Sequence, residues 1–292
     1  MSLINDFIET QLTQWPEARE RYLALGKTQR RRFRIGDLEG AFQCNPARIV
    51  STGAKTDAAS VAARPCFLCR ENRPEQQTAI PLGKNWEMTI NPYPIFPVHF
   101  TIISTSHTPQ DTPPLEMAAI AENFPDLAIF FNGASGGASA PDHLHMQAVL
   151  KSELPLLRLA EANHPDDKPG IMRSDMWGLD LPFVFLSAVI TDDEEGGRDY
   201  LKMLALTGAT PDGRPDKGLR NVFCWKGDSG LLRMIVVPRT CHRPSCYGTE
   251  PGRMMIAPGA IDMAGVVILP RVEDFESITD RQMRVIYQQV TP

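Results

Sequence analysis

His143, His145 and Gln147 stand on alternate residues of a 292-residue chain that contains only six histidines. If this segment is a strand, alternate side chains share one face, so both imidazoles and the Gln147 amide point to one side. Leu144 and Met146 then point to an apolar side. A neutral imidazole is a good nucleophile toward phosphorus at neutral pH. The pattern is typical of a catalytic strand, and metal sites and ordinary polar strand faces contain it as well.

The segment directly before these histidines is rich in glycine, alanine and serine. Backbone N–H groups and hydroxyls in such a loop can bind phosphate oxygens without a net positive charge. A flexible hairpin loop with no ligand has the same composition, but the position next to the histidines favours a phosphate site. The loop residues that we expect to bind nucleotide or phosphate are Asn132, Gly133, Gly137 and Ser139.

Cys66 and Cys69 are separated by two residues, a spacing at which two thiolates can bind one zinc ion. No second Cys-x-x-Cys pair exists, so the other ligands of a tetrahedral site would be histidines, and His107 and His143 are the candidates. A redox pair has the same spacing but usually lies between a strand and a helix. Two ordinary buried cysteines also explain the pattern. The Cys/His cluster at residues 241–246 suits zinc poorly, and we interpret it as structural.

The overall composition argues against several classes of protein. Hydrophobic residues make up 42% of the chain, charged residues 22%, and the net charge of −5 provides no basic field for nucleic acid. The basic run at residues 29–34 is explained more simply as a solvated segment than as a phosphate site. No apolar stretch is long enough to span a membrane, and the N-terminus lacks a signal-peptide pattern. We therefore expect a cytoplasmic protein with reduced thiols or metal ligands.

The elements that must position these residues repeat in order along the chain. After an N-terminal helix, strand and turn residues at 33–50 and a loop from Ser51, the periodicity predicts strands at 86–90, 100–104, 127–132 and 143–150, with a helix from Pro113. A similar order follows a connector that begins at His164, which we expect to be exposed: strands at 183–190, 221–225 and 231–237, and a helix at 199–206. This order indicates an internal duplication in which the second copy lacks the histidines. His99 and His107, at the two ends of one strand, suit core or ligand positions.

Together these segments resemble the transferase branch of the histidine-triad superfamily, which includes galactose-1-phosphate uridylyltransferase, diadenosine tetraphosphate phosphorylase and the GDP-hexose phosphorylases. His143 to Gln147 matches its His-x-His-x-Gln signature, and Asn132 and Ser139 precede it by eleven and four residues. Three more segments are similar to that branch: the nucleotide-pocket segment from Asn91, the phosphorylase motif at 42–48 and the Cys-x-x-Cys of the uridylyltransferases. The stretch 258–275 is similar to the final strand segment of the GDP-hexose phosphorylases.

The resemblance implies an α+β, histidine-triad-like fold with two related antiparallel-sheet halves flanked by helices. The corresponding divisions are an N-terminal helical segment at 1–32, a catalytic half at 33–160, a connector at 161–180 and a divergent half at 181–292. Members of the superfamily are often dimers, so a homodimer is a further expectation.

The resemblance also implies a nucleotidyltransferase or phosphorylase that acts on a nucleotide-activated sugar or a dinucleoside polyphosphate. His145 would form a covalent nucleotidyl-histidine, Gln147 would bind the phosphate, and Asn91 would belong to the nucleotide pocket. His143 would join Cys66, Cys69 and His107 around a structural zinc ion. Phosphate or a sugar phosphate would be the acceptor. A hydrolase of the same fold and a non-catalytic, zinc-stabilised nucleotide-binding scaffold are the alternatives.

Overall fold

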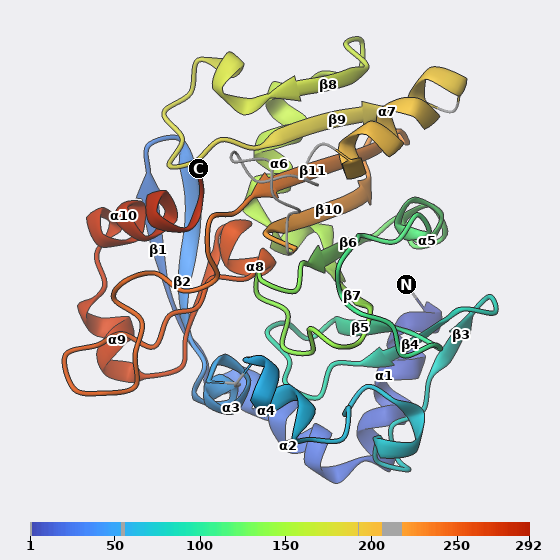
Figure 1. Ribbon diagram of the computed structural model, residues 1–292, viewed down its shortest axis with the longest axis vertical. Helices are drawn as coiled ribbons and strands as arrows, with labels where there is room; N and C mark the ends of the chain where they lie inside the picture. The colour runs from blue at the N-terminus through green and yellow to red at the C-terminus, as the bar shows by residue number, and fades with distance from the viewer. Residues whose placement is uncertain (1, 54–55, 192, 206–217) are drawn as a thin grey trace.

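A nine-stranded antiparallel sheet forms the centre of the computed structural model, which describes residues 2–53, 56–191, 193–205 and 218–292 (Figure 1). The spatial order of its strands is β3 (Ile80–Leu82), β4 (Trp86–Ile90), β5 (His99–Ser104), β7 (His145–Leu150), β6 (Leu127–Asn132), β10 (Arg220–Lys226), β11 (Leu232–Pro238), β9 (Leu186–Ile190) and β8 (Gly170–Arg173). The fold is therefore α+β with large antiparallel sheet, as the sequence predicts.

The order of elements in this sheet occurs twice. The first copy runs β4, β5, helix α5 (Met117–Asn123), β6 and β7, and the second runs β8, β9, helix α7 (Glu194–Ala205), β10 and β11. Both copies have the same pairing. In each copy the fourth strand lies between the second and the third, and the third strand lies at the centre of the nine-stranded sheet. The copies meet where β6 pairs with β10, with Phe130 opposite Phe223. The two halves thus share one continuous sheet and are related by an approximate two-fold arrangement of strands.

Alternating apolar residues give the sheet two buried faces, because successive strand residues point to opposite sides. One face packs against helices near the N-terminus, α1 (Ser2–Gln14) and α2 (Pro16–Ala24), and against α5 and α7. Leu144 and Met146 pack on this face, as the sequence predicts. The other face carries Phe130 and Phe223 and belongs to a second core.

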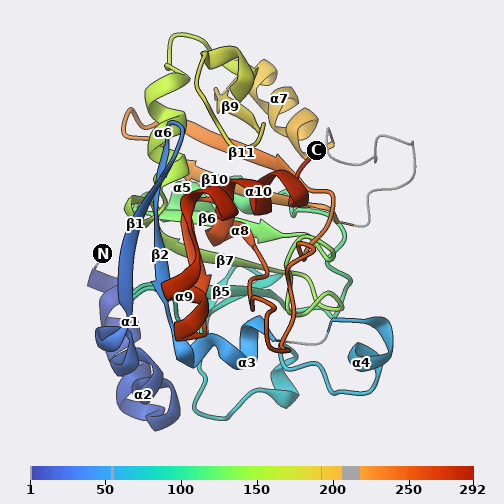
Figure 2. The same cartoon turned by 90° about the vertical axis from the view of Figure 1, so that its left-hand side faces the viewer.

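A small sheet and several helices cover this second face (Figure 2). The sheet contains β1 (Gln29–Ile35), β2 (Leu38–Cys44) and β12 (Val266–Leu269). The remaining helices are α3 (Ile49–Thr52), α4 (Ala58–Ala62), α6 (Pro155–Asn163), α8 (Ala260–Met263), α9 (Val272–Ser277) and α10 (Asp280–Val290). The basic run of residues 29–34 is β1, and the Arg31 guanidinium packs over the Phe42 ring and donates to the carbonyls of Phe275 and Ile278. That arginine therefore ties the small sheet to α9.

Several predicted boundaries differ from the structure. The helix expected from Pro113 begins at Met117, because the Met117 N–H closes a turn onto the Pro114 carbonyl. The strand expected from His143 begins at His145. Part of the predicted helix at 199–206 forms the C-terminal portion of α7, and Leu206 lies outside the described residues.

The expectation that His164 is exposed is wrong. Its side chain is buried, its ring nitrogens contact the Ser187 hydroxyl and the Lys168 carbonyl, and its own carbonyl accepts a bond from Arg233. Polarity suggested a solvated connector, but long-range partners satisfy these groups inside the protein.

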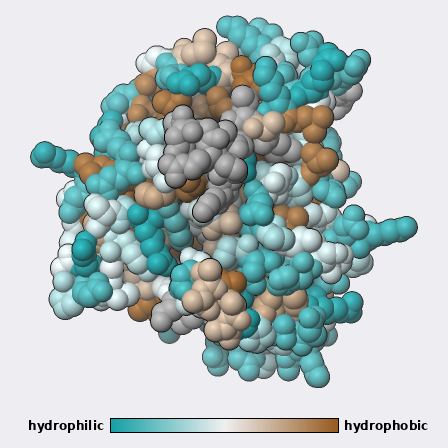
Figure 3. Space-filling view, in the orientation of Figure 1, coloured by the Kyte–Doolittle hydropathy of each residue, from teal (hydrophilic) through white to brown (hydrophobic). Residues whose placement is uncertain are grey.

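Hydrophilic side chains predominate on the face shown in Figure 3, and the hydrophobic ones form small separate groups. Within the described ranges, none of the helices has the length and apolar character needed to cross a membrane.

Candidate active site

His145 is the first residue of β7 and lies opposite Ile103 of β5. Its side chain is buried at the edge of a large cavity. Its Nδ1 lies 2.8 Å from the carbonyl oxygen of His143. A carbonyl can only accept, so Nδ1 carries the proton and donates it, which leaves a lone pair on Nε2. Burial lowers the pKa of His145 to about 4, so the ring is neutral at physiological pH.

Gln147 lies two residues further along β7, and a buried histidine determines which way its amide points. The N–H of Ile95 donates to His99 Nδ1 at 3.1 Å, so the proton of the neutral His99 ring must be on Nε2. That Nε2 donates to Gln147 Oε1 at 2.8 Å. Burial lowers the pKa of His99 to about 3, which keeps this arrangement at neutral pH. The NH2 group of Gln147 is therefore the part available to a ligand.

Asn91, expected in the nucleotide pocket, lines the same large cavity. Its Nδ2 donates to Gln147 Oε1 at 3.3 Å and to Thr101 Oγ1 at 3.2 Å, while its Oδ1 accepts from the Tyr93 N–H. Asn91 therefore helps His99 to hold the Gln147 carbonyl oxygen, in addition to forming part of the cavity wall.

Gln110 separates the ends of β6 and β7 at His145. The two strands pair up to Phe130 opposite Gln147, and two residues further on this register would bring Asn132 opposite His145. Instead, the buried Gln110 side chain accepts from the His145 N–H at 2.7 Å and donates to the carbonyls of Asn132 and His145. This insertion explains why the strand starts at His145 and why His143 does not share its face.

The small-residue loop contributes to the site unevenly. Ser139 lines both cavities of the site and Gly137 lines the smaller one, and neither of their backbone N–H groups has a partner among the described residues. Gly137 has φ of +114°, a conformation that favours glycine. These two residues have the properties expected of a phosphate loop.

Gly133 and Asn132 are held by the second half of the protein. The N–H of Gly133 donates to the Arg220 carbonyl, and a Cβ at Gly133 would lie 2.0 Å from the Gly218 oxygen. The sequence expectation of a phosphate-binding N–H at Gly133 thus gives way to close backbone packing. Asn132 Oδ1 accepts from the Ala260 N–H at 2.7 Å and from Asn221. Asn132 lines the smaller cavity and anchors the segment that closes it.

Two cavities meet beside the histidine strand. The larger has a volume of about 610 Å³, and its walls include the aromatic side chains of Trp15, Phe67 and Tyr93. The smaller has a volume of about 80 Å³ and is formed partly by residues 257–262. Three residues line both cavities: Arg48, Ser139 and Gln147. The site therefore offers a large partly aromatic compartment, which His145 lines, and a small polar one.

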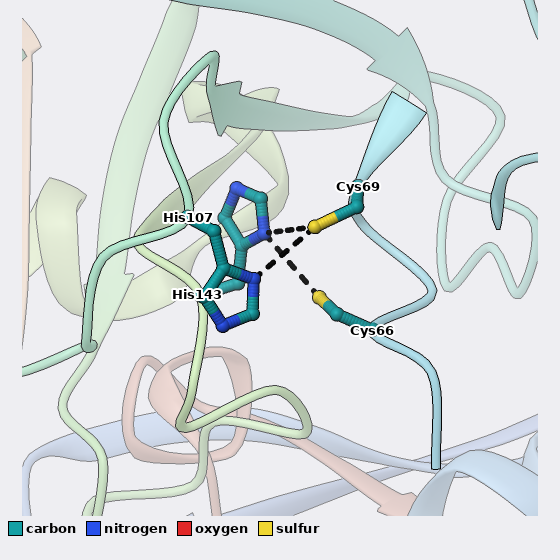
Figure 4. A group of neighbouring side chains, drawn as sticks. All are labelled: Cys66, Cys69, His107 and His143. Carbon is teal, nitrogen blue, oxygen red and sulfur yellow. Dashed lines mark hydrogen bonds between the residues drawn. The ribbon is translucent and has the colours of Figure 1, made fainter. Parts of the chain in front are cut away.

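Four predicted metal ligands come together next to this site (Figure 4). One ligand atom from each of Cys66, Cys69, His107 and His143 lies within 4.8 Å of the others. His143 Nδ1 lies 3.3 Å from Cys66 Sγ, and His107 Nδ1 lies 3.1 Å from Cys69 Sγ. This Cys2His2 cluster could bind a metal ion, and its ligands come from three loops that are far apart in the sequence.

The chemistry of the donor set fits a cation. His143 Nε2 donates to the Ser104 carbonyl at 2.9 Å, which leaves Nδ1 free as a ligand atom. Burial and the neighbouring Cys66 raise the pKa of Cys69 to about 11, so two thiolates here would need a cation to offset their charge. The His143 carbonyl also accepts from the His145 ring, so His143 connects the cluster to His145.

Sequence reasoning missed three residues of the site. The sequence places His99 in a core or ligand position without a more specific role. Arg48 occurs in the motif at 42–48, and no pattern in the sequence points to Gln110. Gln110 contacts His145, which is 35 residues away, and His99 contacts Gln147, which is 48 residues away. Arg48 lines the smaller cavity. The position of His99 directly before the predicted strand at 100–104 is the one sequence feature that could have indicated a role in the site.

Comparisons with known proteins agree with this fold. A family model described as a domain of unknown function (DUF4922) matches residues 7–150. No curated protein matches the sequence. Among solved structures, yeast Ap4A phosphorylase Apa2 is similar with a TM-score of 0.60 at 13% identity, over 95% of this chain and 97% of that chain. The same yeast enzyme in complex with Ap4A has a TM-score of 0.56 at 13% identity, over 96% and 97% of the two chains.

The chain therefore shares the α+β fold of yeast Ap4A phosphorylase Apa2, a histidine-triad-like fold of the kind that the sequence motifs indicated. At 13% identity, this structural similarity shows the fold alone.

Proposed function

We propose that this protein is a nucleotidyltransferase or phosphorylase that works through a covalent nucleotidyl-histidine at His145. The observation that carries this proposal is the His145 ring itself, which is buried, neutral and protonated on Nδ1, so that its Nε2 lone pair is available beside a large cavity. A neutral imidazole held in one tautomer is prepared to attack phosphorus without first losing a proton.

The larger cavity is the place for the nucleoside of the donor. Its volume of about 610 Å³ and its aromatic walls suit a base and a ribose. Thr89, Thr101 and Gln147 lie side by side on β4, β5 and β7 and line this cavity, so the donor would lie along these strands with its α-phosphate near His145.

In the first step, the Nε2 lone pair of His145 forms a bond to the α-phosphorus. The bond from phosphorus to the leaving oxygen breaks, and that oxygen departs with the electron pair. The Gln147 NH2 group and the N–H groups of Gly137 and Ser139 would donate to the charged phosphoryl oxygens, since these residues line the smaller cavity. Loss of one such donor typically costs about a hundredfold in rate. In the second step, a lone pair of an acceptor oxygen forms a bond to the phosphorus. The bond from phosphorus to His145 Nε2 breaks, and its electron pair returns to the ring, which becomes neutral again.

We also propose that the Cys2His2 cluster binds zinc as a structural ion. Two thiolates and two imidazoles are a common tetrahedral zinc set. Because all four ligands come from the protein, the ion would have no open position for a substrate. Zinc would hold three loops together, and through His143 it would fix the carbonyl that orients His145.

A trapping experiment tests the proposal. The purified protein is incubated with UDP-sugar, GDP-sugar, ADP-sugar and Ap4A, each labelled on the α-phosphate. We expect an acid-labile protein adduct from at least one donor, and none in His145→Ala. His164→Gln serves as the matched control, because this histidine lines neither cavity.

Absence of an adduct from every donor would contradict the proposal. Binding of the same donors without turnover, unchanged in His145→Ala, would support a nucleotide-binding scaffold. Release of mononucleotide without any acceptor would instead identify a hydrolase.

The zinc proposal is tested by measuring the zinc content per chain. We expect close to one ion per chain in the wild type and almost none in Cys66→Ser.

A further inference from the structure

Helix α2 forms part of the wall of the larger cavity, although it lies before the predicted catalytic half of the chain. Trp15, Glu17 and Arg21 line the cavity from the start and middle of this helix. The Tyr22 hydroxyl donates to the His99 carbonyl at 3.2 Å, which fixes α2 against β5. The side chains of α2 that line the cavity are therefore held on a rigid element.

Glu17 and Arg21 lie four residues apart, so they share one face of α2 and have a spacing at which a glutamate and an arginine commonly pair. In this structure Arg21 has other partners. Its Nη1 donates to the Pro92 carbonyl at 3.3 Å, and its guanidinium lies 4.5 Å from the centre of the Tyr93 ring. Glu17 is exposed, and its carboxylate has no hydrogen bond or ion pair with any other described residue. Its oxygens are therefore free to accept from a ligand.

The charges of the cavity wall give the ligand a direction. Among the described residues, Glu17 is the only carboxylate that lines the larger cavity. Arg48, a cation, lines it together with Gln147 and Ser139, which also line the smaller cavity. A carboxylate repels phosphate and a guanidinium attracts it. The phosphates of a bound nucleotide would therefore lie toward Arg48, and Glu17 would face the nucleoside.

A carboxylate can only accept hydrogen bonds, which limits the bases that it can recognise. Guanine presents two adjacent donors, its ring N1–H and its exocyclic N2–H2 group, which can both donate to one carboxylate. Adenine has an amino donor beside a ring nitrogen that accepts, and uracil has one N–H between two carbonyl oxygens. In those two bases a lone pair would face the Glu17 oxygens and be repelled. Guanine is therefore the base that fits this wall.

We propose that the donor nucleotide carries guanine and that Glu17 accepts from its N1–H and N2–H2 groups. This inference rests on the proposed function for the place of the nucleoside, and it adds the identity of the base. Arg21 is a positioning residue, because it holds the segment with Pro92 and Tyr93 against α2 and leaves Glu17 unpaired. Base specificity would then come from the N-terminal helices, outside the strands that carry the chemistry.

The first test compares nucleoside monophosphates with the wild-type protein. GMP, IMP, AMP and UMP are titrated by calorimetry, since a monophosphate has no leaving group and cannot form the adduct. We expect GMP to bind more tightly than AMP and UMP by a factor of about ten or more. IMP differs from GMP only by the loss of the exocyclic amino group, so its affinity should fall about tenfold below that of GMP.

The second test replaces the carboxylate. In Glu17→Gln the amide can accept from only one of the two guanine donors, and its NH2 group opposes the other. The affinities for GMP, AMP and UMP should then lie within about threefold of one another. Glu20→Gln is the matched control, an exposed glutamate of the same helix that does not line the cavity, and it should keep the wild-type preference. Because both positions are exposed, both variants should melt close to the wild-type temperature.

GMP binding no tighter than AMP and UMP would overturn the inference, and so would an equal loss for all three nucleotides in Glu17→Gln. An adduct from ADP-sugar or UDP-sugar but not from GDP-sugar would also overturn it and would leave the proposed function intact. A preference for GMP that depends on Glu17, with no adduct from any donor, would support the base assignment and contradict the proposed chemistry.

Discussion

The two halves of the central sheet have the same strand order but carry different side chains on equivalent faces. In the first half, β7 places His145 and Gln147 on the face that also carries Phe130. In the second half, β11 places Arg233 on the equivalent face, opposite Trp225 of β10. The Arg233 guanidinium donates to the His164 carbonyl and pairs with Asp166, so its charge is neutralised within the protein.

The ends of the paired strands show why only one half has a site. In the second half, β10 and β11 stay paired to Lys226 opposite Leu232 and are joined by a short turn. In the first half, Gln110 separates Asn132 from His145, and a longer loop follows. In the first half, the separated strand ends lie beside a cavity that His145 and Gln147 line, whereas the corresponding strand ends of the second half stay paired.

The largest contrast between the halves should appear when the nucleophile is removed. His145→Ala should lower adduct formation by a factor of a thousand or more, because no other group can form the bond to phosphorus. Its melting temperature should stay close to that of the wild type. Adduct formation is measured with the donor that labels the wild-type protein. A variant that retains the label would move the chemistry away from β7.

Replacement of the equivalent residue in the second half should have the opposite effect. Arg233→Met removes the partner of Asp166 and leaves the His164 carbonyl without its donor. We expect a loss of about 2 kcal/mol in the free energy of unfolding, since Asp166 can still reach solvent. Urea unfolding measures this loss, and adduct formation at low denaturant should be unchanged. A loss of chemistry with stability intact would mean that the second half takes part in the reaction.

The inserted glutamine offers a smaller and more specific test. Gln110→Leu leaves the His145 N–H and two carbonyls without their partner and should cost about 1–3 kcal/mol of stability. Because the start of β7 shifts, the rate of adduct formation should also fall, by about tenfold. Gln11→Leu is the matched control, a buried glutamine with comparable bonds in α1. Equal rate losses in both variants would remove the specific role of Gln110.

The smallest expected effect is a dependence of stability on pH. The pKa of His99 is about 3 in the folded protein and near 6.5 when unfolded, so the unfolded state binds more protons between these values. The stability contributed by His99 is present above pH 6.5 and is lost as the pH falls toward 3. The difference in unfolding free energy between wild type and His99→Gln should therefore shrink from pH 7 to pH 4. A difference that is constant with pH would show that His99 has the same pKa in the folded and unfolded protein.

The sequence predicted local features well because they depend on periodicity and residue type. Strands at 86–90 and 127–132 agree with the structure to the residue. The Cys-x-x-Cys spacing and two histidines identified the four ligands of the cluster. Predictions that needed a distant partner did less well. His164 looked like a solvated connector because its partners, Ser187 and Arg233, are more than 20 residues away.

His143 and His145 illustrate what the sequence determines by itself and what only the tertiary structure determines. The residue types and their spacing predict nucleophilic and metal-binding roles for this segment, since those properties belong to the imidazoles themselves. The tertiary structure places the two rings in different surroundings. Gln110 accepts from the His145 N–H where β7 begins, and Cys66 lies against the His143 ring. The His99 ring donates to the carbonyl oxygen of the Gln147 amide, which leaves the NH2 group toward the cavity. Those assignments arise from hydrogen bonds between segments that meet only in the folded chain, which local sequence patterns cannot encode.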